Sequence, residues 1–410
     1  MIWNFILQSM RGWQNRMRIL SITAQKPNST GSGVYLTELV KEFAKSGHEQ
    51  AVVAGIYADD VVELPKGVAF YPVYFSSEEL PYPITGMSDE MPYRSTRYCD
   101  MTPEMVEQFK CAFLKVIEKA VCDLKPDVIL CHHLYLLTAI VREHFPEHKI
   151  YGFCHNTDLR QMQKTDLERV YIRKQINKLD RIFVPQSAQE EGVMDIYGVK
   201  NDKITIVGMG YNSQIFCPSG EKIKDGVTRL VFAGKISEKK GVMSLLRSLS
   251  LLDYEKDSLK LYLAGSTGNE EEYRVIEQLA EECPYEVIFL GRLSQTELAK
   301  IYNQCDIFVL PSFFDGLPLT VIEALACHDR VVMSELPGIP TWLSKSAPGA
   351  DIRYVKMPKM KNTDEPVESE LPAFEERLAK ELQESIETKE TKIADVSQIS
   401  WKRIAERVLE

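Results

Sequence analysis

The sequence predicts an α/β protein with two domains, each built on a parallel β-sheet covered by helices. The chain has 410 residues, which is more than one ordinary domain holds. Short apolar runs suited to buried strands alternate with segments of helical periodicity in both halves. A glycine-containing stretch over 208–227 interrupts that alternation, so we expect the interdomain linker there.

The first half begins with a buried strand, Arg18–Thr23, followed by a polar loop and a helix over Val34–Ser46. Apolar residues at 36, 39, 40 and 43 give that helix one buried face, and Gly47 ends it. Further strands are expected at 50–55, 68–75, 127–131, 149–153, 181–185 and 203–207. Helices are expected at 103–123, 135–144, 166–178 and 187–197, with a long loop over 76–102.

The second half repeats the alternation and ends in a charged tail from residue 361 and an amphipathic helix, SWKRIAERVLE. Its strands are expected at 229–233, 260–264, 287–290, 307–310 and 331–333. Its helices are expected at 241–252, 270–282, 294–304 and 319–327. We therefore expect an N-terminal extension (1–16), an N-terminal domain (17–210), a C-terminal domain (211–396) and a terminal helix (397–410). Ligands of such sheets bind at the carboxyl ends of the strands.

Composition excludes several classes of protein. The formal net charge of −10 argues against non-specific nucleic-acid binding. No apolar run is long enough to span a membrane, and the mildly apolar residues 1–16 could be an extension, an alternative start or an interfacial helix that contacts the membrane. The nine cysteines are scattered and form no CxxC pair, which favours a reducing, cytoplasmic compartment.

Two short motifs, Cys131-His132-His133 and Cys154-His155, combine residue types that bind metals. Neighbouring residues of a strand point to opposite faces, so neither motif is suited to chelation. We expect buried thiols there and no metal site.

The clearest motif for chemistry is PSFFDGLPLTVIEALAC, residues 311–327. Seven residues separate Asp315, on a loop, from Glu323, on the second turn of the following helix. Backbone N–H groups of residues 316–320 are expected to lie exposed between them. Carboxylates accept hydrogen bonds from sugar and ribose hydroxyls, and a helix N-terminus binds diphosphate, so these parts suit a nucleotide sugar. The alternative is an ordinary loop and helix with two solvated acids.

A second motif, FAGKISEKKGVMSLLRSL, covers residues 232–249. A strand leads into Lys235, and Lys240 precedes a helix start. Ammonium groups at a strand end can hold a diphosphate and neutralise the charge that develops on a leaving group. Cations are unfavourable at a helix N-terminus unless an anion lies nearby, which argues against simple solvation of Lys240.

With these motifs, residues 229–333 and 399–409 resemble the retaining glycosyltransferase family four. The resemblance implies the GT-B fold, in which two Rossmann-like domains face a cleft and the last helix packs on the N-terminal domain. It also implies metal-independent sugar transfer, with retention, from a nucleotide diphosphate sugar that we expect to be a UDP-sugar. The acceptor would be a glycan or a lipid-linked molecule in cell-surface polysaccharide or glycoconjugate synthesis, and no further cofactor is implied.

The resemblance also implies roles for individual residues. Glu323 would bind the donor ribose, and Asp315 the hydroxyls of the transferred sugar. Lys235 and Lys240 would hold the diphosphate. His155, in CHNTDLRQ, matches the family's histidine near the reacting sugar. Other expected donor-binding positions are Gly31, Gly33, Gly316, Leu317, Pro318 and Leu319.

This chain departs from the family pattern at two of those positions. Lys235 stands where arginine is usual and lacks a planar fork for bidentate binding. Asp315 stands where glutamate is more usual and reaches one methylene less far.

Three other classes share parts of this pattern. A dinucleotide-dependent oxidoreductase would carry GxGxxG directly after the first strand, but Gly31 and Gly33 lie several residues beyond it and Leu36 takes the third glycine's place. A nucleotide-sugar epimerase of the same shape and an inactive homologue that acts as a scaffold subunit both remain open.

Overall fold

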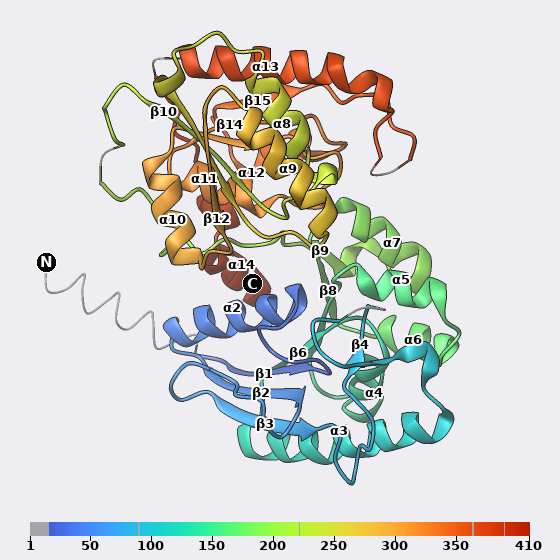
Figure 1. Cartoon of the computed structure of the whole chain (residues 1–410). Coiled ribbons are helices and arrows are strands. Elements are labelled where there is room, and N and C mark those ends of the chain that lie inside the picture. Colours follow the sequence, from blue (N-terminus) through green and yellow to red (C-terminus); the bar gives the residue numbers. More distant parts are fainter. Residues whose placement is uncertain (1–15, 89–90, 221, 363–364, 389) are drawn as a thin grey trace, which may run out of the picture. The chain divides into compact units, whose positions relative to one another are not determined.

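The computed structural model describes residues 16–88, 91–220, 222–362, 365–388 and 390–410 (Figure 1). The expected extension therefore lies outside the described residues, except for its last position. The chain divides into two compact units, the first containing residues up to Met209 together with Ile404–Glu410, and the second containing Gly210–Arg403. Each unit is an α/β domain with a parallel sheet, as the sequence predicts.

The N-terminal domain is built on a seven-stranded sheet in the order β3-β2-β1-β6-β7-β8-β9. Every neighbouring pair of strands in it is parallel. Its strands are β1 (Arg18–Thr23), β2 (Glu49–Ile56), β3 (Ala69–Tyr74), β6 (Val128–His132), β7 (Ile150–Phe153), β8 (Arg181–Val184) and β9 (Ile204–Ile206). A separate pair, β4 (Thr85–Gly86) and β5 (Thr96–Arg97), lies in the expected loop.

Helices cover both faces of this sheet (Figure 1). On one face, Val52 of β2 packs with Leu36 and Val40 of α2. On the other face, Val53 belongs to the larger core, which contains Phe109 of α3. The alternation of side chains along a strand thus buries both faces of β2, as in other doubly covered parallel sheets. The helices are α2 (Gly31–Lys45), α3 (Pro103–Leu124), α4 (Leu136–His144), α5 (Thr157–Lys164), α6 (Arg169–Ile176) and α7 (Ser187–Tyr197).

The C-terminal domain is built on a six-stranded parallel sheet in the order β12-β11-β10-β13-β14-β15. Its strands are β10 (Thr228–Ala233), β11 (Leu259–Ala264), β12 (Glu286–Gly291), β13 (Ile307–Leu310), β14 (Arg330–Ser334) and β15 (Ile352–Val355). Its helices are α8 (Val242–Leu249), α9 (Glu270–Glu282), α10 (Gln295–Gln304), α11 (Leu319–Ala326), α12 (Ile339–Ser346) and α13 (Leu371–Glu387). The last helix, α14 (Trp401–Leu409), passes from the second unit into the first.

Several sequence-based expectations were wrong in detail. The single helix expected near 166–178 is preceded by an additional helix, α5, and α6 starts only after Glu168, whose φ of 47° breaks the helical path. Two further elements, α12 and β15, are not predicted from the sequence. The expected charged tail contains α13, whose buried Phe374, Leu378 and Leu382 form an apolar stripe that packs on α8, β14 and β15.

Both strand orders contain one point at which the chain reverses its direction of progress across the sheet. In the N-terminal domain this point lies between β1 and β6, and in the C-terminal domain between β10 and β13. Loops after two such strands leave the sheet in opposite directions, which opens a crevice at their carboxyl ends. Lys235, Lys240 and Asp315 lie on the loops after β10 and β13, whereas His155 follows β7, the neighbour of β6.

Candidate functional site

Close backbone packing positions the loops at the carboxyl edge of the C-terminal sheet. Gly234 and Gly265 follow β10 and β11, and a Cβ atom on Gly265 would come within 1.7 Å of the Gly234 carbonyl oxygen. The Ile236 amide donates to the Ser266 carbonyl at 3.1 Å. The loops after β10 and β11 therefore pack directly against each other. Only glycine permits this close packing at position 265, where φ is +149°.

The loops after β10 and β13 are joined in the same way. Gly241, with φ of +70°, ends the short 3₁₀ helix Glu238–Lys240, and a Cβ atom there would lie 2.0 Å from the Pro311 carbonyl oxygen. The Phe313 amide donates to the Lys239 carbonyl at 3.0 Å. Lys240 is thereby held beside the loop that carries the first acid of the Asp315/Glu323 motif.

Lys240 and Asp315, which belong to separate sequence motifs, form an ion pair. The Lys240 ammonium lies 2.8 Å from Asp315 Oδ2 and 3.3 Å from the Phe314 carbonyl oxygen. Their side chains are 26% and 23% exposed, so the pair stays open to solvent and to an incoming charged ligand. The anion that stabilises a cation at this helix start is thus supplied by the chain itself.

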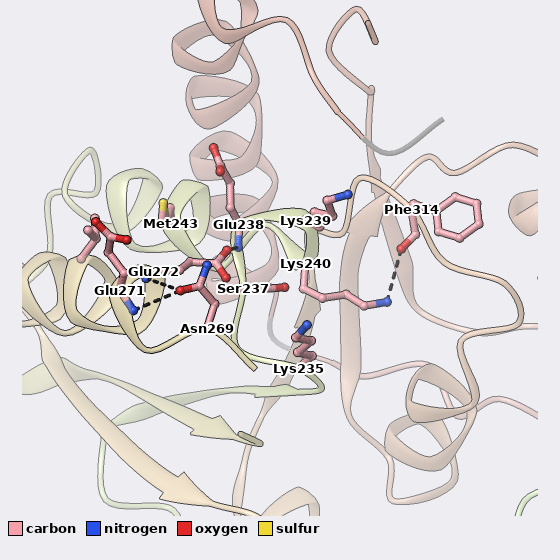
Figure 2. A pocket seen from close by; sticks show the side chains of 11 residues that line it. Lys235, Ser237, Glu238, Lys239, Lys240, Met243, Asn269, Glu271, Glu272 and Phe314 are labelled. Carbon is pink, nitrogen blue, oxygen red and sulfur yellow. Dashed lines mark hydrogen bonds between the residues drawn. The ribbon is translucent and has the colours of Figure 1, made fainter. Parts of the chain in front are cut away.

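Lys235 borders two cavities at this edge. One, of about 450 Å³, is lined by the ends of β10 and β11 together with Arg292, Leu293 and Thr320. The other, of about 630 Å³, lies between the 3₁₀ helix and the start of α9 and reaches Phe314 (Figure 2). Figure 2 shows Lys240 extended toward the Phe314 carbonyl with Lys235 close beside it. Two ammonium groups thus lie at the mouth of cavities of a size that binds small molecules.

Glu323 belongs to α11, and its side chain is buried rather than exposed to solvent. Its side chain belongs to a residue that is only 8% exposed, and its carboxylate accepts no hydrogen bond from any residue that the structure describes. Burial raises the pKa of Glu323 to about 8. A hydroxyl group that donated to this carboxylate would satisfy it and favour its charged form.

The expected row of exposed amide groups over 316–320 is interrupted at three of its five positions. The Gly316 N–H donates to Asp315 Oδ1 at 3.0 Å, and the Leu319 N–H donates to the Leu317 carbonyl at 2.9 Å. Pro318 has no N–H to offer. An anion at this loop would therefore meet fewer free amide groups than the sequence predicts.

In the N-terminal domain, His155 follows β7 and lies among other ring side chains. Its Nε2 atom is 3.2 Å from Nδ1 of His132, and its ring meets those of Tyr35 and His133 edge to face, at 5.4 and 4.8 Å. Burial, reinforced by the charge of His133, lowers the pKa of His155 to about 3. His155 is therefore neutral near neutral pH.

A buried chain of hydrogen bonds organises this region. His133 Nδ1 lies 2.8 Å from Asp158 Oδ1, and His133 Nε2 lies 2.9 Å from the Ser32 hydroxyl oxygen. Asp158 also accepts the N–H groups of Leu134 and His155 at 2.9 and 3.1 Å. Burial alone would raise the pKa of Asp158, but its contact with His133 outweighs burial and lowers it to about 2. The ends of β6 and β7 are thereby fixed together.

The two glycines expected to approach the donor differ from each other. A Cβ atom on Gly33 would lie 2.6 Å from the Lys26 carbonyl oxygen, so glycine is needed there for contact with the chain's own loop. A Cβ atom on Gly31 would meet nothing within 4 Å. Thr30 caps α2 by accepting the Gly33 N–H at 3.1 Å.

Ser32, His132, His133 and Asp158 are members of this group that the sequence motifs do not predict. Their position in the sequence is the signal that could have found them. His132 and His155 stand at the carboxyl ends of β6 and β7, which are neighbouring parallel strands. Within the described residues no group of three or more histidine, cysteine or acidic side chains is arranged to hold a metal ion. None of the described helices is both long enough and apolar enough to cross a membrane.

Two α/β domains with ligand-sized cavities and charged groups at a switch point define a Rossmann-like, two-domain class of nucleotide-binding architecture. Residues 29–214 match the family model described as Glycosyltransferase Family 4, and residues 218–350 match that of the Glycosyl transferases group 1. The chain belongs to the group 1 glycosyltransferases, which confirms the family predicted from the sequence motifs.

Relatives of known sequence are similar over part of their length. A glycosyltransferase of Methanocaldococcus jannaschii is 26% identical over 240 residues, 52% of this chain and 59% of that protein. The D-inositol 3-phosphate glycosyltransferase of Stackebrandtia nassauensis is 28% identical over 190 residues, 42% and 43% of the two chains. The chain thus spans about half the length of the curated relatives that it matches.

Solved structures share the fold over almost the whole chain. A glycosyltransferase of Rickettsia africae aligns with a TM-score of 0.64 and 14% identity, covering 96% of this chain and 97% of that one. The Anabaena protein HepE in complex with UDP and glucose aligns with a TM-score of 0.56 and 14% identity, covering 96% and 95%. These similarities confirm the predicted GT-B type of fold.

Proposed function

We propose that this protein transfers a sugar from a UDP-sugar to a glycan or lipid-linked acceptor, with retention of configuration. The observation that carries the proposal is the arrangement of Lys235 and Lys240 between the cavity at the ends of β10 and β11 and the acid Asp315. A nucleoside in that cavity would place its diphosphate on the two ammonium groups. The choice of UDP is supported by HepE, a similar structure that was solved with UDP.

The chemistry assigns one task to each group. Glu323 accepts hydrogen bonds from the ribose, and Asp315 accepts them from the sugar that is transferred. When the bond between the sugar and the diphosphate breaks, negative charge grows on the departing phosphate, and Lys235 and Lys240 stabilise that charge. His155 acts on the transferred sugar, as the family resemblance implies. Retention of configuration is proposed on the same resemblance.

Binding of the donor has to exchange one partner of Lys240 for another. Asp315 holds the ammonium at 2.8 Å in the structure. A diphosphate carries more charge than one carboxylate and can take over the ammonium, which releases Asp315 to accept sugar hydroxyls. Breaking the ion pair thus frees Lys240 for the diphosphate and Asp315 for the sugar.

The lysines also supply the positive charge that a divalent cation provides in other transferases. We therefore propose that transfer does not depend on a metal ion. Acceptors are expected among glycans and lipid-linked sugars rather than nucleic acids, because the formal net charge of −10 repels polyanions.

Thermal denaturation with a panel of nucleoside diphosphates and nucleotide sugars, followed by a transfer and donor-hydrolysis assay, tests this function. At a hundredfold excess over its dissociation constant, UDP should stabilise the fold by about 2.7 kcal/mol. An unchanged melting temperature with every nucleoside diphosphate would contradict the donor site. Binding without any transfer or hydrolysis would instead support a scaffold role.

A further inference from the structure

His132 is a buried neighbour of His155 that the proposed chemistry does not use. It is 3% exposed, and its ring stacks on Phe153 with the centroids 4.7 Å apart and the planes at 5°. Its Nδ1 atom shares a hydrogen bond with His155 Nε2, whereas its own Nε2 atom is buried with no hydrogen-bond partner among the described residues. His155 Nδ1 makes no hydrogen bond within the described part of the chain.

Both imidazoles are neutral near neutral pH, because burial lowers the pKa of each. A neutral imidazole carries one N–H and one lone pair, so the shared hydrogen bond leaves two arrangements. If His155 donates, His132 must carry its proton on the buried Nε2 atom, where an N–H group has no acceptor. If His132 donates, its buried Nε2 atom keeps only a lone pair.

The second arrangement is the more favourable one. Buried N–H groups without an acceptor are the rarer kind of unsatisfied group in folded proteins, and leaving a buried donor unpaired costs about 1–3 kcal/mol. His132 then donates from Nδ1 to His155 Nε2, and the single proton of His155 resides on Nδ1.

We propose that His132 is a positioning residue that holds His155 in the Nδ1–H tautomer, so that His155 offers a hydrogen-bond donor from its unpaired nitrogen. The consequence for the reaction rests on the proposed function. His155 donates to an oxygen of the transferred sugar or its phosphate, and its Nδ1 atom has no lone pair with which to accept a proton from the acceptor hydroxyl.

The surroundings of His155 preserve this arrangement. Tyr35 meets the His155 ring at 75° and His133 meets it at 60°, so two other rings pack against it. Asp158 accepts the backbone N–H of His155 at 3.1 Å and fixes the strand end from which the side chain leaves. Rotation of the imidazole would break the hydrogen bond to His132 and disturb both ring contacts.

Two substitutions at position 132 separate hydrogen bonding from packing. In His132→Asn the amide nitrogen stands the same number of bonds from Cα as Nδ1 and can donate to His155. In His132→Phe the ring still stacks on Phe153 but has no nitrogen. His144→Phe serves as the matched control, since His144 is a half-exposed residue of α4 that pairs with Glu118.

The tautomer is measured directly by NMR on the full-length protein with ¹⁵N-labelled histidine, without ligand. The wild type, His132→Asn and His144→Phe should carry the His155 proton on Nδ1, whereas His132→Phe should show a mixture of both tautomers. A wild-type spectrum with the His155 proton on Nε2 would overturn the proposal, even if neither variant at position 132 folds.

Kinetics with UDP-glucose as the probe donor provide the second readout. His132→Phe should lower kcat about tenfold, the effect of one misplaced hydrogen bond, while UDP affinity stays unchanged. His132→Asn should recover most of that loss, and equal losses in both variants would overturn a role through hydrogen bonding. If the wild type turns over no nucleotide sugar but shows the Nδ1 proton, the proposed function fails and the tautomer assignment stands.

Discussion

The two switch points occupy the same place in two similar sheets but differ in how their side chains are satisfied. In the C-terminal domain, Lys240 pairs with a partly exposed acid, and Glu323 has no hydrogen-bond partner among the described residues. In the N-terminal domain, Asp158 is fully buried and accepts hydrogen bonds from His133, Leu134 and His155. Strand order sets where a site forms. The hydrogen-bond and ion-pair partners of the site's polar groups decide whether a ligand can replace those partners.

This difference suggests a division of labour. Groups such as Lys240 and Glu323 can bind a charged donor, because the ligand replaces a partly exposed ion pair or supplies a hydrogen bond that is missing. Groups whose hydrogen bonds are already satisfied within the domain gain little from such an exchange, but they hold a side chain such as His155 in one orientation. Substitutions in the C-terminal domain should therefore change binding and turnover, whereas those around His155 should change turnover alone.

The largest effect is expected at Lys240. Lys240→Ala removes a preorganised positive charge next to the departing phosphate, and turnover should fall by about 10²–10³. Initial rates of UDP-sugar consumption measure the change. Lys256→Ala, at an exposed lysine of the same domain, is the control and should match the wild type. Wild-type rates from Lys240→Ala would place the diphosphate elsewhere.

The next largest effect is expected at Glu323. Glu323→Gln removes the carboxylate that accepts from the ribose once the donor is bound, so the affinities for UDP and for a UDP-sugar should both fall by about 1.5–3 kcal/mol. Isothermal titration calorimetry measures both affinities. An unchanged Kd for each ligand would mean that Glu323 is only a buried part of α11.

A smaller and more selective effect is expected at Asp315. Asp315→Asn removes the ion-pair partner of Lys240 and the acceptor for the sugar hydroxyls, so UDP should bind equally well or more tightly. The UDP-sugar should bind about tenfold more weakly, the effect of one lost hydrogen bond. Asp253→Asn, at an exposed acid of the same domain, is the matched control. Equal weakening of both ligands would contradict the assignment of Asp315 to the sugar.

The smallest effect is expected from removal of metal ions. Because Lys235 and Lys240 supply the positive charge, EDTA should leave the rate of transfer unchanged within the error of the assay. Loss of activity that Mn²⁺ or Mg²⁺ restores would show that the lysines do not replace a cation.

The same comparison explains how far the sequence could predict the site. Lys240, Asp315 and Glu323 lie in two short continuous motifs, so their proximity follows from one strand–loop–helix unit and its neighbour. Ser32 and Asp158 come from separate segments that meet His133 only in the folded chain. Strand order was needed to bring them together, and periodicity does not reveal strand order.

Backbone contacts limited the prediction in a similar way. The motif predicts free amides over 316–320, but the Gly316 N–H is satisfied by the neighbouring Asp315 side chain. Gly33 was assigned to the donor, although the structure requires glycine there for contact with Lys26. The motifs indicate which residues are special but not which of several close contacts requires them.

The proton balance of donor binding tests the donor site most directly. Burial raises the pKa of Glu323 to about 8, so its carboxyl group is mostly protonated at about pH 7. Ribose hydroxyls that donate to the carboxylate favour its charged form, so UDP-glucose binding should release a proton at about pH 7 and tighten as the pH rises through about 8. Calorimetry in two buffers of different ionisation enthalpy measures that release. The account predicts proton release by the wild type and none by Glu323→Gln, whereas equal proton release and equal affinity in both proteins would contradict it.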